Sequence, residues 1–164
     1  MAISSENFRD ALRHFPSGVT IVTIKSPVTE TVHGLTVSAF ASVSPEPPLI
    51  LVSIDHRATA HELLEVEGAT FAVNILRQDH VELSNRFAWL KDEDRFAQGS
   101  WEIAVTGAPV LKDALAWMDC RIYARFPAGS HTIYIGEVVE FGIPRPDEYP
   151  LIYWNRGYRH LQSK

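Results

Sequence analysis

The chain has 164 residues, a formal net charge of −5 at pH 7 and a single cysteine, Cys120. This length fits one domain, residues 1–164, and 46% hydrophobic with 21% charged residues is typical of a globular protein. The acidic balance argues against nucleic acid or an anionic membrane surface as a partner, since both bind through basic clusters. The polar N-terminus and the lack of a long apolar run predict no signal peptide and no membrane segment. One cysteine excludes an internal disulfide, so we expect a reducing, cytoplasmic location.

The first half of the chain predicts two helices and four short strands. A helix capped by Ser5 would place four apolar residues on one face: Phe8, Ala11, Leu12 and Phe15. Runs of β-branched and apolar residues predict strands at 19–24, 34–40, 49–54 and 70–75. A polar turn at 55–59 leads into a short helix that Gly68 ends.

The second half is dominated by two long strands. We expect a helix at 78–89, a charged loop at 91–100, strands at 114–126 and 131–141, and a short aromatic segment at 151–158. The turn Ala128–Gly129–Ser130 would join the long strands as a hairpin. Several strands, three short helices and no strict βα alternation predict a mainly β protein, an antiparallel barrel with peripheral helices.

The stretch from His33 to Asp55 is the most informative chemically. Its first part contains a glycine and several hydroxyls: Gly34, Thr36, Ser38, Ser42 and Ser44. A Pro-rich corner at 45–48 and an apolar strand follow. Hydroxyl and N–H groups suit a phosphate, and an apolar wall with backbone hydrogen bonds near Ser53 suits a flat ring. The combination fits an FMN-type cofactor, although an ordinary β-hairpin explains the same residues.

Three single residues are candidates for chemistry outside this stretch. His131 follows a tight turn and could reach the mouth of a barrel, or it could be a strand-end histidine with one backbone hydrogen bond. Arg86 could pair with a phosphate, or lie on a solvated helix face beside Glu82. Cys120 lies in an apolar strand, which favours packing over redox chemistry. Metal-ligand spacing is lacking, so no metal site is expected. A dinucleotide fingerprint and a nucleophile elbow are also lacking, which argues against a Rossmann NAD site and against serine hydrolysis.

Motifs along nearly the whole chain resemble those of the flavin reductase family, on the FMN-binding split-barrel fold. The core match is GLTVSAFASVSPEPPLILVSID at 34–55. The others follow in the family's order: FPSGVT at 15–20, FAVNIL at 71–76, LS and RFA within 83–88, GAPVL at 107–111, GSH and GEV within 129–138, and PLIY and GYR within 150–159. Each motif is weak alone, and the ordered set is specific.

The resemblance implies a set of site residues. The flavin would be lined by Thr36, Val37, Ser38, Ala39, Ser53, Ile54 and Asp55. Three residues would face its phosphate end, His56, Ala58 and Thr59, and three more would approach it, Arg86, Phe87 and Tyr158. His131 would lie near the flavin and the nicotinamide and could orient the latter. The family often has serine where this chain has Ala58, which removes one hydroxyl from the phosphate side.

The implied activity is that of an NAD(P)H-dependent flavin reductase, the reductase component of a two-component monooxygenase. It would pass a hydride from NADH or NADPH to FMN or FAD, and reduced flavin would diffuse to an oxygenase partner. A homodimer is implied, and six aromatics beyond the needs of one core also fit an interface: Trp89, Trp101, Trp117, Tyr153, Trp154 and Tyr158. The alternatives are a non-catalytic FMN-binding electron carrier and, last, a pyridoxamine-phosphate-oxidase-like enzyme on the same barrel.

Overall fold

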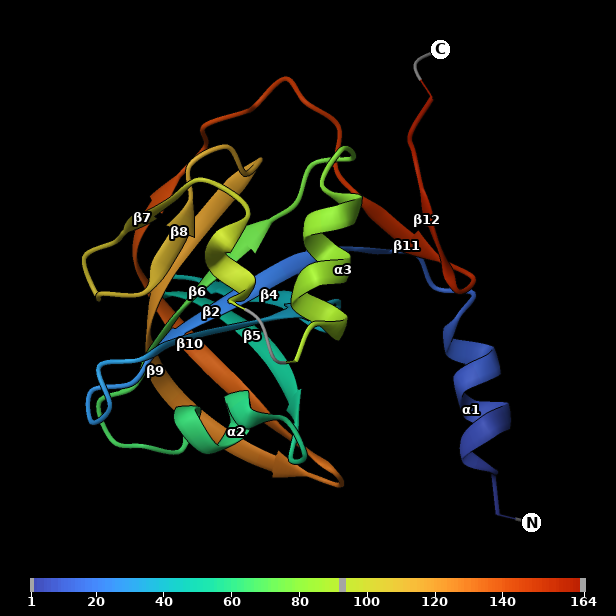
Figure 1. Cartoon of the computed structure of the whole chain (residues 1–164). Coiled ribbons are helices and arrows are strands. Elements are labelled where there is room, and N and C mark those ends of the chain that lie inside the picture. Colours follow the sequence, from blue (N-terminus) through green and yellow to red (C-terminus); the bar gives the residue numbers. More distant parts are fainter. Residues whose placement is uncertain (1, 92–93, 163–164) are drawn as a thin grey trace.

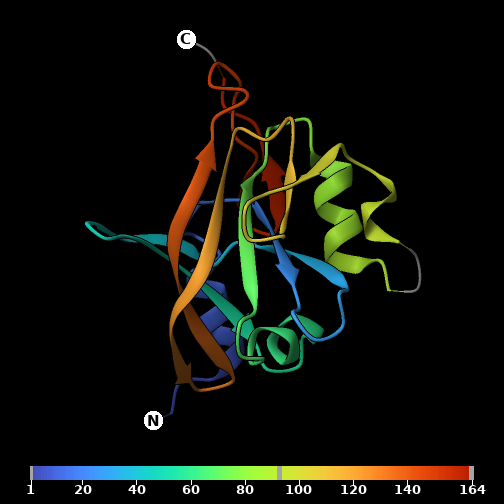
Figure 2. The same ribbon diagram turned by 90° about the vertical axis from the view of Figure 1, so that its left-hand side faces the viewer.

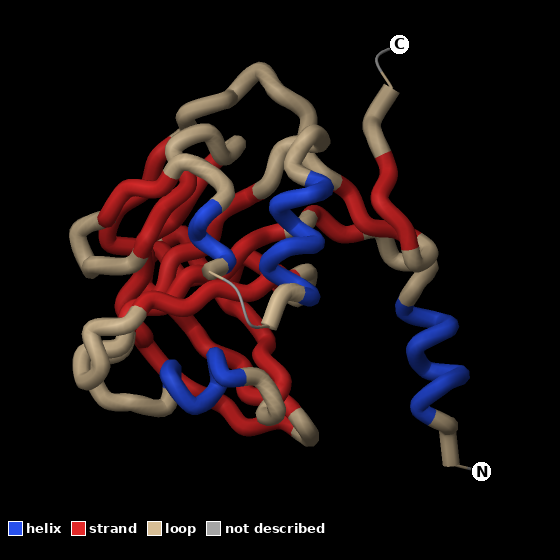
Figure 3. Tube along the Cα trace, viewed as in Figure 1, coloured by secondary structure: helices blue, strands red, loops and turns tan. Residues whose placement is uncertain are grey.

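The computed structural model describes residues 2–91 and 94–162. Strands dominate, with helices at the periphery (Figure 3). The elements in chain order are α1 (Ser5–Leu12), β1 (Ser17–Gly18), β2 (Thr20–Lys25), β3 (Val32–Val37), β4 (Phe40–Pro45), β5 (Pro48–Asp55), α2 (Thr59–Leu64), β6 (Thr70–Ile75), α3 (Val81–Trp89), the 3-10 helix η1 (Arg95–Ala97), β7 (Trp101–Ile103), β8 (Pro109–Leu111), β9 (Ala116–Ala128), β10 (His131–Gly142), β11 (Ile152–Trp154) and β12 (Gly157–Arg159).

The main sheet has seven antiparallel strands in the order β3-β2-β6-β9-β10-β5-β4. Its two edge strands, β3 and β4, are consecutive in the chain and are joined by only Ser38 and Ala39. This short link brings the two edges together, and the sheet curls into a barrel (Figures 1 and 2). At the seam Ser53 N–H donates to the Ala39 carbonyl oxygen at 3.0 Å. The predicted mainly β barrel with peripheral helices is confirmed.

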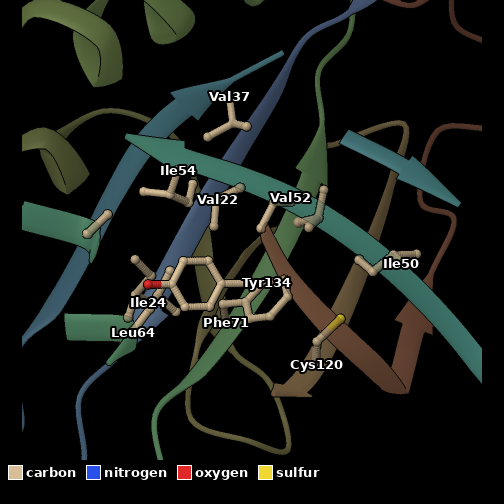
Figure 4. Packing of buried hydrophobic residues seen from close by; sticks show 12 residues of the cluster. Val22, Ile24, Val37, Ile50, Val52, Ile54, Leu64, Phe71, Cys120 and Tyr134 are labelled. Carbon is tan, nitrogen blue, oxygen red and sulfur yellow. The ribbon is translucent and has the colours of Figure 1, made fainter. Parts of the chain in front are cut away.

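The barrel interior is filled by side chains from most strands of the sheet (Figure 4). The cluster comprises Val22, Ile24, Val37, Ile50, Val52, Ile54, Ala60, Leu64, Phe71, Val73, Cys120 and Tyr134. A second cluster lies outside the barrel beneath α3, and it includes Val19, Ile21, Leu83 and Phe87. Strand β2 contributes to both clusters because alternate side chains point to opposite faces. The predicted packing role of Cys120 is confirmed, since its side chain is fully buried.

Helix α1 stands away from the barrel (Figure 1). Its C-terminal end is held by the β11–β12 hairpin, where Trp154 Nε1 donates to the His14 carbonyl oxygen at 3.0 Å and Asn155 N–H to that of Arg13 at 2.9 Å. Phe8, Leu12 and Phe15 are 55%, 53% and 76% exposed. No helix in the described part of the chain is both long and apolar enough to cross a bilayer.

Several boundaries differ from the sequence-based expectation. The α1 N-cap is Ser4, whose hydroxyl accepts from Asn7 N–H at 3.1 Å, and not Ser5. Strand β3 ends at Val37 because the chain turns into the seam, and α3 begins at Val81. The expected loop at 91–100 contains η1, and the β7–β8 hairpin was not predicted. Strands of three residues are too short to show a recognisable alternation of apolar and polar side chains in the sequence.

The packing of the interior predicts the effect of one added methyl group. Gly136 lies at a bulge in β10, and a Cβ there would come within 2.5 Å of the Phe71 ring and 2.9 Å of Cys120 Cβ. We expect Gly136→Ala to lower the free energy of unfolding by about 1–3 kcal/mol through overpacking. Gly18→Ala is the matched control, since a Cβ there meets nothing within 4 Å. Equal urea midpoints for the two variants would contradict this account of the core.

Candidate functional site

Hydroxyl groups from three distant segments meet beside β3. Thr36 Oγ1 donates to the Ser84 carbonyl oxygen at 2.6 Å, and Ser84 Oγ lies 2.8 Å from the Tyr158 hydroxyl. That hydroxyl also donates to Asn85 Oδ1 at 3.0 Å. These residues, together with Ser38, line a cavity of about 290 Å³. The fold thus brings together three of the predicted site residues, Thr36, Ser38 and Tyr158.

The seam of the barrel forms the next part of the site. Ser38 and Ala39 are exposed, and the hydrogen bond from Ser53 to Ala39 joins two predicted flavin-lining stretches. Val37 and Ile54 point into the barrel core, where they are 6% and 1% exposed. Any contact of these two residues with a bound molecule would therefore have to use their backbone groups.

The rim beyond Ser53 is charged and polar. Asp55 accepts from Arg57 Nη2 at 2.7 Å and from Arg57 Nε at 3.1 Å. These bonds from Arg57 hold the pKa of the Asp55 carboxyl well below its usual value. His131 is the cross-strand partner of Asp55, and its Nδ1 lies 2.9 Å from Ser130 Oγ. His131 thus lies beside Asp55 at the tight turn, and its reach to the mouth of a cavity stays a prediction.

The start of α2 lies close to this rim. His56 N–H donates to the Ser130 carbonyl oxygen at 3.0 Å, and His56 Nε2 lies 3.0 Å from Thr132 Oγ1. Ala58 is the N-cap of α2 and makes no side-chain capping bond, which serine at this position could supply. Ala58 and Thr59 line a large cavity that also reaches Thr36. Two of the three predicted phosphate-side residues, Ala58 and Thr59, therefore line the same cavity as Thr36, which was predicted to contact the ring.

The side chain of Arg86 is engaged by backbone. Its Nε donates to the Arg95 carbonyl oxygen at 3.0 Å, and its Nη2 donates to that of Asp94. Arg86 therefore braces the segment that leads into η1. A phosphate contact of Arg86 stays a prediction. The alternative, a solvated helix face beside Glu82, does not fit the described structure, because Arg86 donates to two backbone carbonyl oxygens.

Phe87 is buried and sets the distance between α3 and β3. Its ring contacts those of Phe96 and Trp101, with centroids 5.1 Å and 5.4 Å away. A Cβ at Gly34 would come within 2.6 Å of the Phe87 ring, so only glycine permits this approach. The close contact of α3 with β3 is what places Ser84 beside Thr36.

The large cavity, which we call cavity 1, has a volume of about 800 Å³. It lies along the free edge of β3, between that strand, the start of α2, the end of α3 and the segment 94–96. The lining residues that sequence reasoning missed include His33, Trp89, Lys91 and Arg95. His33 adjoins the core motif, but the loop that contains Arg95 offered no signal. Charged loops are ordinarily solvated.

The arrangement fits a flavin. The exposed seam residues Ser38 and Ala39, the hydroxyls of Thr36 and Ser38, and a cavity lined by Thr59 provide donors for a polar ring edge and room for a phosphate. Within residues 2–91 and 94–162, no group of three His, Cys, Asp or Glu side chains is placed to hold a metal ion. Burial raises the pKa of the Cys120 thiol, which keeps that side chain unreactive.

Comparison with known families gives a match over nearly the whole chain. Residues 12–162 match the family model described as "Flavin reductase like domain". The chain is 43% identical over 159 residues to the flavin reductase (NADH) of Kitasatospora aureofaciens, covering 95% of this chain and 81% of that protein. It is 40% identical over 158 residues to the reductase component of 4-hydroxyphenylacetate 3-monooxygenase from Thermus thermophilus, covering 95% of this chain and 96% of that protein.

A solved structure shares the fold. The flavin reductase PheA2 in its native state superposes with a TM-score of 0.85 at 37% identity, covering 98% of this chain and all of that chain. The similarity therefore extends over the barrel, the helices and the C-terminal hairpin together.

The half-buried position of His33, in the same cavity wall as Arg95, predicts a pH effect on stability. Burial, and next the charge of Arg95, lower the pKa of His33. The unfolded chain then binds more protons than the folded chain below about pH 6.5, so stability falls as the pH drops through that value. We expect His33→Gln to flatten the decline in free energy of unfolding between about pH 7 and pH 5. The exposed His160→Gln is the control; identical pH slopes in denaturant titrations would refute the assignment.

Proposed function

Because the chain belongs to the flavin reductase family, we infer that the seam site serves hydride transfer from NADH or NADPH to FMN or FAD. The chain is an NAD(P)H:flavin oxidoreductase. The observation that supports this site best is the meeting of Thr36, Ser38, Ser84 and Tyr158 next to the exposed backbone of the barrel seam. Its relatives include proteins named as reductase components of monooxygenases, so the reduced flavin would serve an oxygenase partner.

We propose that the flavin ring lies against the seam. Residues 36–39 and 53–55 would contact it, chiefly through backbone N–H and carbonyl groups, because Val37 and Ile54 direct their side chains into the core. A bound flavin supplies the hydride-accepting chemistry itself, so no side chain has to act as acid or base. The work of the chain's residues is to hold the ring, shield one face from water and leave the other open to a flat nicotinamide.

The phosphate end would extend into cavity 1. Ala58 and Thr59 line it next to Arg57, and Thr36 connects it to the ring side. His56 would act indirectly here, since its ring is held by Thr132 at the rim. Phe87 and Arg86 would support the site, the first through its contact with Gly34 and the second by bracing residues 94 and 95.

Steady-state oxidation of NADH and NADPH in air, with riboflavin, FMN or FAD added, tests this function. We expect turnover that saturates with free flavin. The rival, a non-catalytic flavin-binding electron carrier, predicts a yellow protein that keeps its flavin through gel filtration and oxidises neither nicotinamide. That result would replace the reductase assignment.

His131 is the candidate for orienting the nicotinamide at the rim. Its backbone position opposite Asp55 is set by the β5–β10 ladder, so its ring can be removed without altering the strand. We expect His131→Ala to lower kcat for NADH oxidation roughly tenfold through lost orientation, with little change in the flavin dissociation constant. His160→Ala is the exposed-histidine control. Turnover equal to that of the unsubstituted protein would remove His131 from the mechanism.

We further propose that the protein is a homodimer, a cytoplasmic single domain, with α1 in the interface. Helix α1 exposes Phe8 and Leu12, the turn after it exposes Phe15, and the helix stands apart from its own barrel, so it buries too little apolar surface to be stable alone. The cavity between α1 and the β11–β12 hairpin also reaches Ser38 and Ala39, so a partner covering α1 would lie near the flavin.

Sedimentation analysis tests the dimer. We expect a species of twice the chain mass of 18.4 kDa, and Leu12→Glu should shift it toward the monomer because a charge would be buried in the interface. Val28→Glu, an exposed apolar residue on the β2–β3 loop, should leave the mass unchanged. A monomer in the unsubstituted protein, or a dimer unaffected by Leu12→Glu, would contradict the proposed interface.

A further inference from the structure

Cavity 1 is larger than a flavin mononucleotide phosphate needs. Its volume of about 800 Å³ is in the range of complete small-molecule sites, whereas Ala58, Thr59 and Thr36 account for only part of its wall. The rest of the wall includes His33, Trp89, Lys91 and Arg95, which have no part in the function proposed above. Along β3, His33 lies three residues from Thr36, or roughly 10 Å. The space therefore continues along β3 well past Thr36.

Arg95 is fixed in this wall and suited to an anion. Its Nε donates to the Leu90 carbonyl oxygen at 2.7 Å, and its Nη1 donates to that of Gly34 at 2.6 Å. Nη2 has no acceptor among the described residues. Burial lowers the pKa of Arg95, and burial and the charge of Arg95 lower the pKa of His33, so two basic groups line one cavity without full solvation. A phosphate between them would relieve both effects. Among the described residues that line cavity 1, Asp94 is the acidic one. Its carboxylate already accepts a hydrogen bond from Phe96 N–H at 2.9 Å.

Trp89 offers a flat apolar surface in the same space. It is the last residue of α3, its side chain is 77% exposed, and it lines both cavity 1 and the smaller cavity beside Tyr158. An exposed indole at the edge of a cavity with anion-binding groups is suited to stacking a nucleobase. A pyrophosphate near Arg95 and a base on Trp89 together describe an adenosine diphosphate.

We propose that cavity 1 binds the adenosine-diphosphate half of FAD, and that this chain therefore prefers FAD to FMN. The inference rests on the proposed function of the seam site. NADH has the same adenosine diphosphate, and FAD is favoured because cavity 1 is continuous with Ala58 and Thr59, where the flavin's own phosphate would lie. Arg95 and His33 are assigned to the pyrophosphate, and Trp89 to the adenine.

Flavin fluorescence titrations test the preference without relying on activity. We expect FAD to bind about tenfold more tightly than FMN, the ratio that one base stacked on an aromatic ring can supply. Trp89→Ala should abolish that ratio by weakening FAD alone, because FMN has no adenine. Tyr149→Ala, an exposed aromatic in the loop after β10, is the matched control and should leave both dissociation constants unchanged. Equal affinities for FAD and FMN in the unsubstituted protein would overturn the proposal, as would equal losses for both flavins in Trp89→Ala.

Inhibition by 5′-AMP separates the two sources of adenosine diphosphate. Competition against FAD in the NADH oxidation assay supports the assignment. Competition against NADH but not FAD would overturn it and assign cavity 1 to the nicotinamide cofactor. The two proposals fail in different ways: lack of NADH oxidation with every flavin refutes the reductase function, while the FAD and FMN dissociation constants still decide the preference.

Discussion

The covalent link between the two edges of the main sheet is the constraint on which this structure depends. β3 and β4 lie at opposite ends of the strand order, yet only Ser38 and Ala39 separate them in the chain. A twisted antiparallel sheet can meet this requirement only by curling, and the interior then has to be filled by large side chains such as Phe71 and Tyr134. The link itself lies at the surface and lacks regular strand partners. The exposed backbone of the candidate site is thus a consequence of closing the barrel.

Strand β3 contributes to the site from three sides. One face points into the barrel, where Val37 joins the core. The other meets α3, and Gly34 permits the Phe87 ring to approach so closely that Ser84 reaches Thr36. The free edge borders cavity 1 and presents the carbonyl oxygen that accepts from Arg95. A single edge strand therefore provides packing, hydroxyl groups and a cavity wall together, which an inner strand with both edges paired could not do.

The sequence predicted the long elements and much of the seam. Alternation and β-branched residues are strong local signals in the strands of the barrel, so their approximate positions were correct. The family motif marked Thr36, Ser38 and Tyr158, which the fold brings together. The motif could not tell that Val37 and Ile54 point inward, because a register position relative to the core is a property of the assembled sheet. Nor could it tell that Arg86 would be held by two carbonyl oxygens.

By itself, the sequence determined the fold class, the family and the stretch around which the site is built, because these follow from local periodicity and from residues adjacent in the chain. The tertiary structure alone decided what surrounds that stretch. Cavity 1 is formed by four segments from different parts of the chain, and Trp89 and Arg95 belong to it only because α3 packs against β3 and Arg95 bonds to the Gly34 carbonyl oxygen. No local pattern encodes such a meeting, since the separation of those segments along the chain is far longer than any helix or strand period.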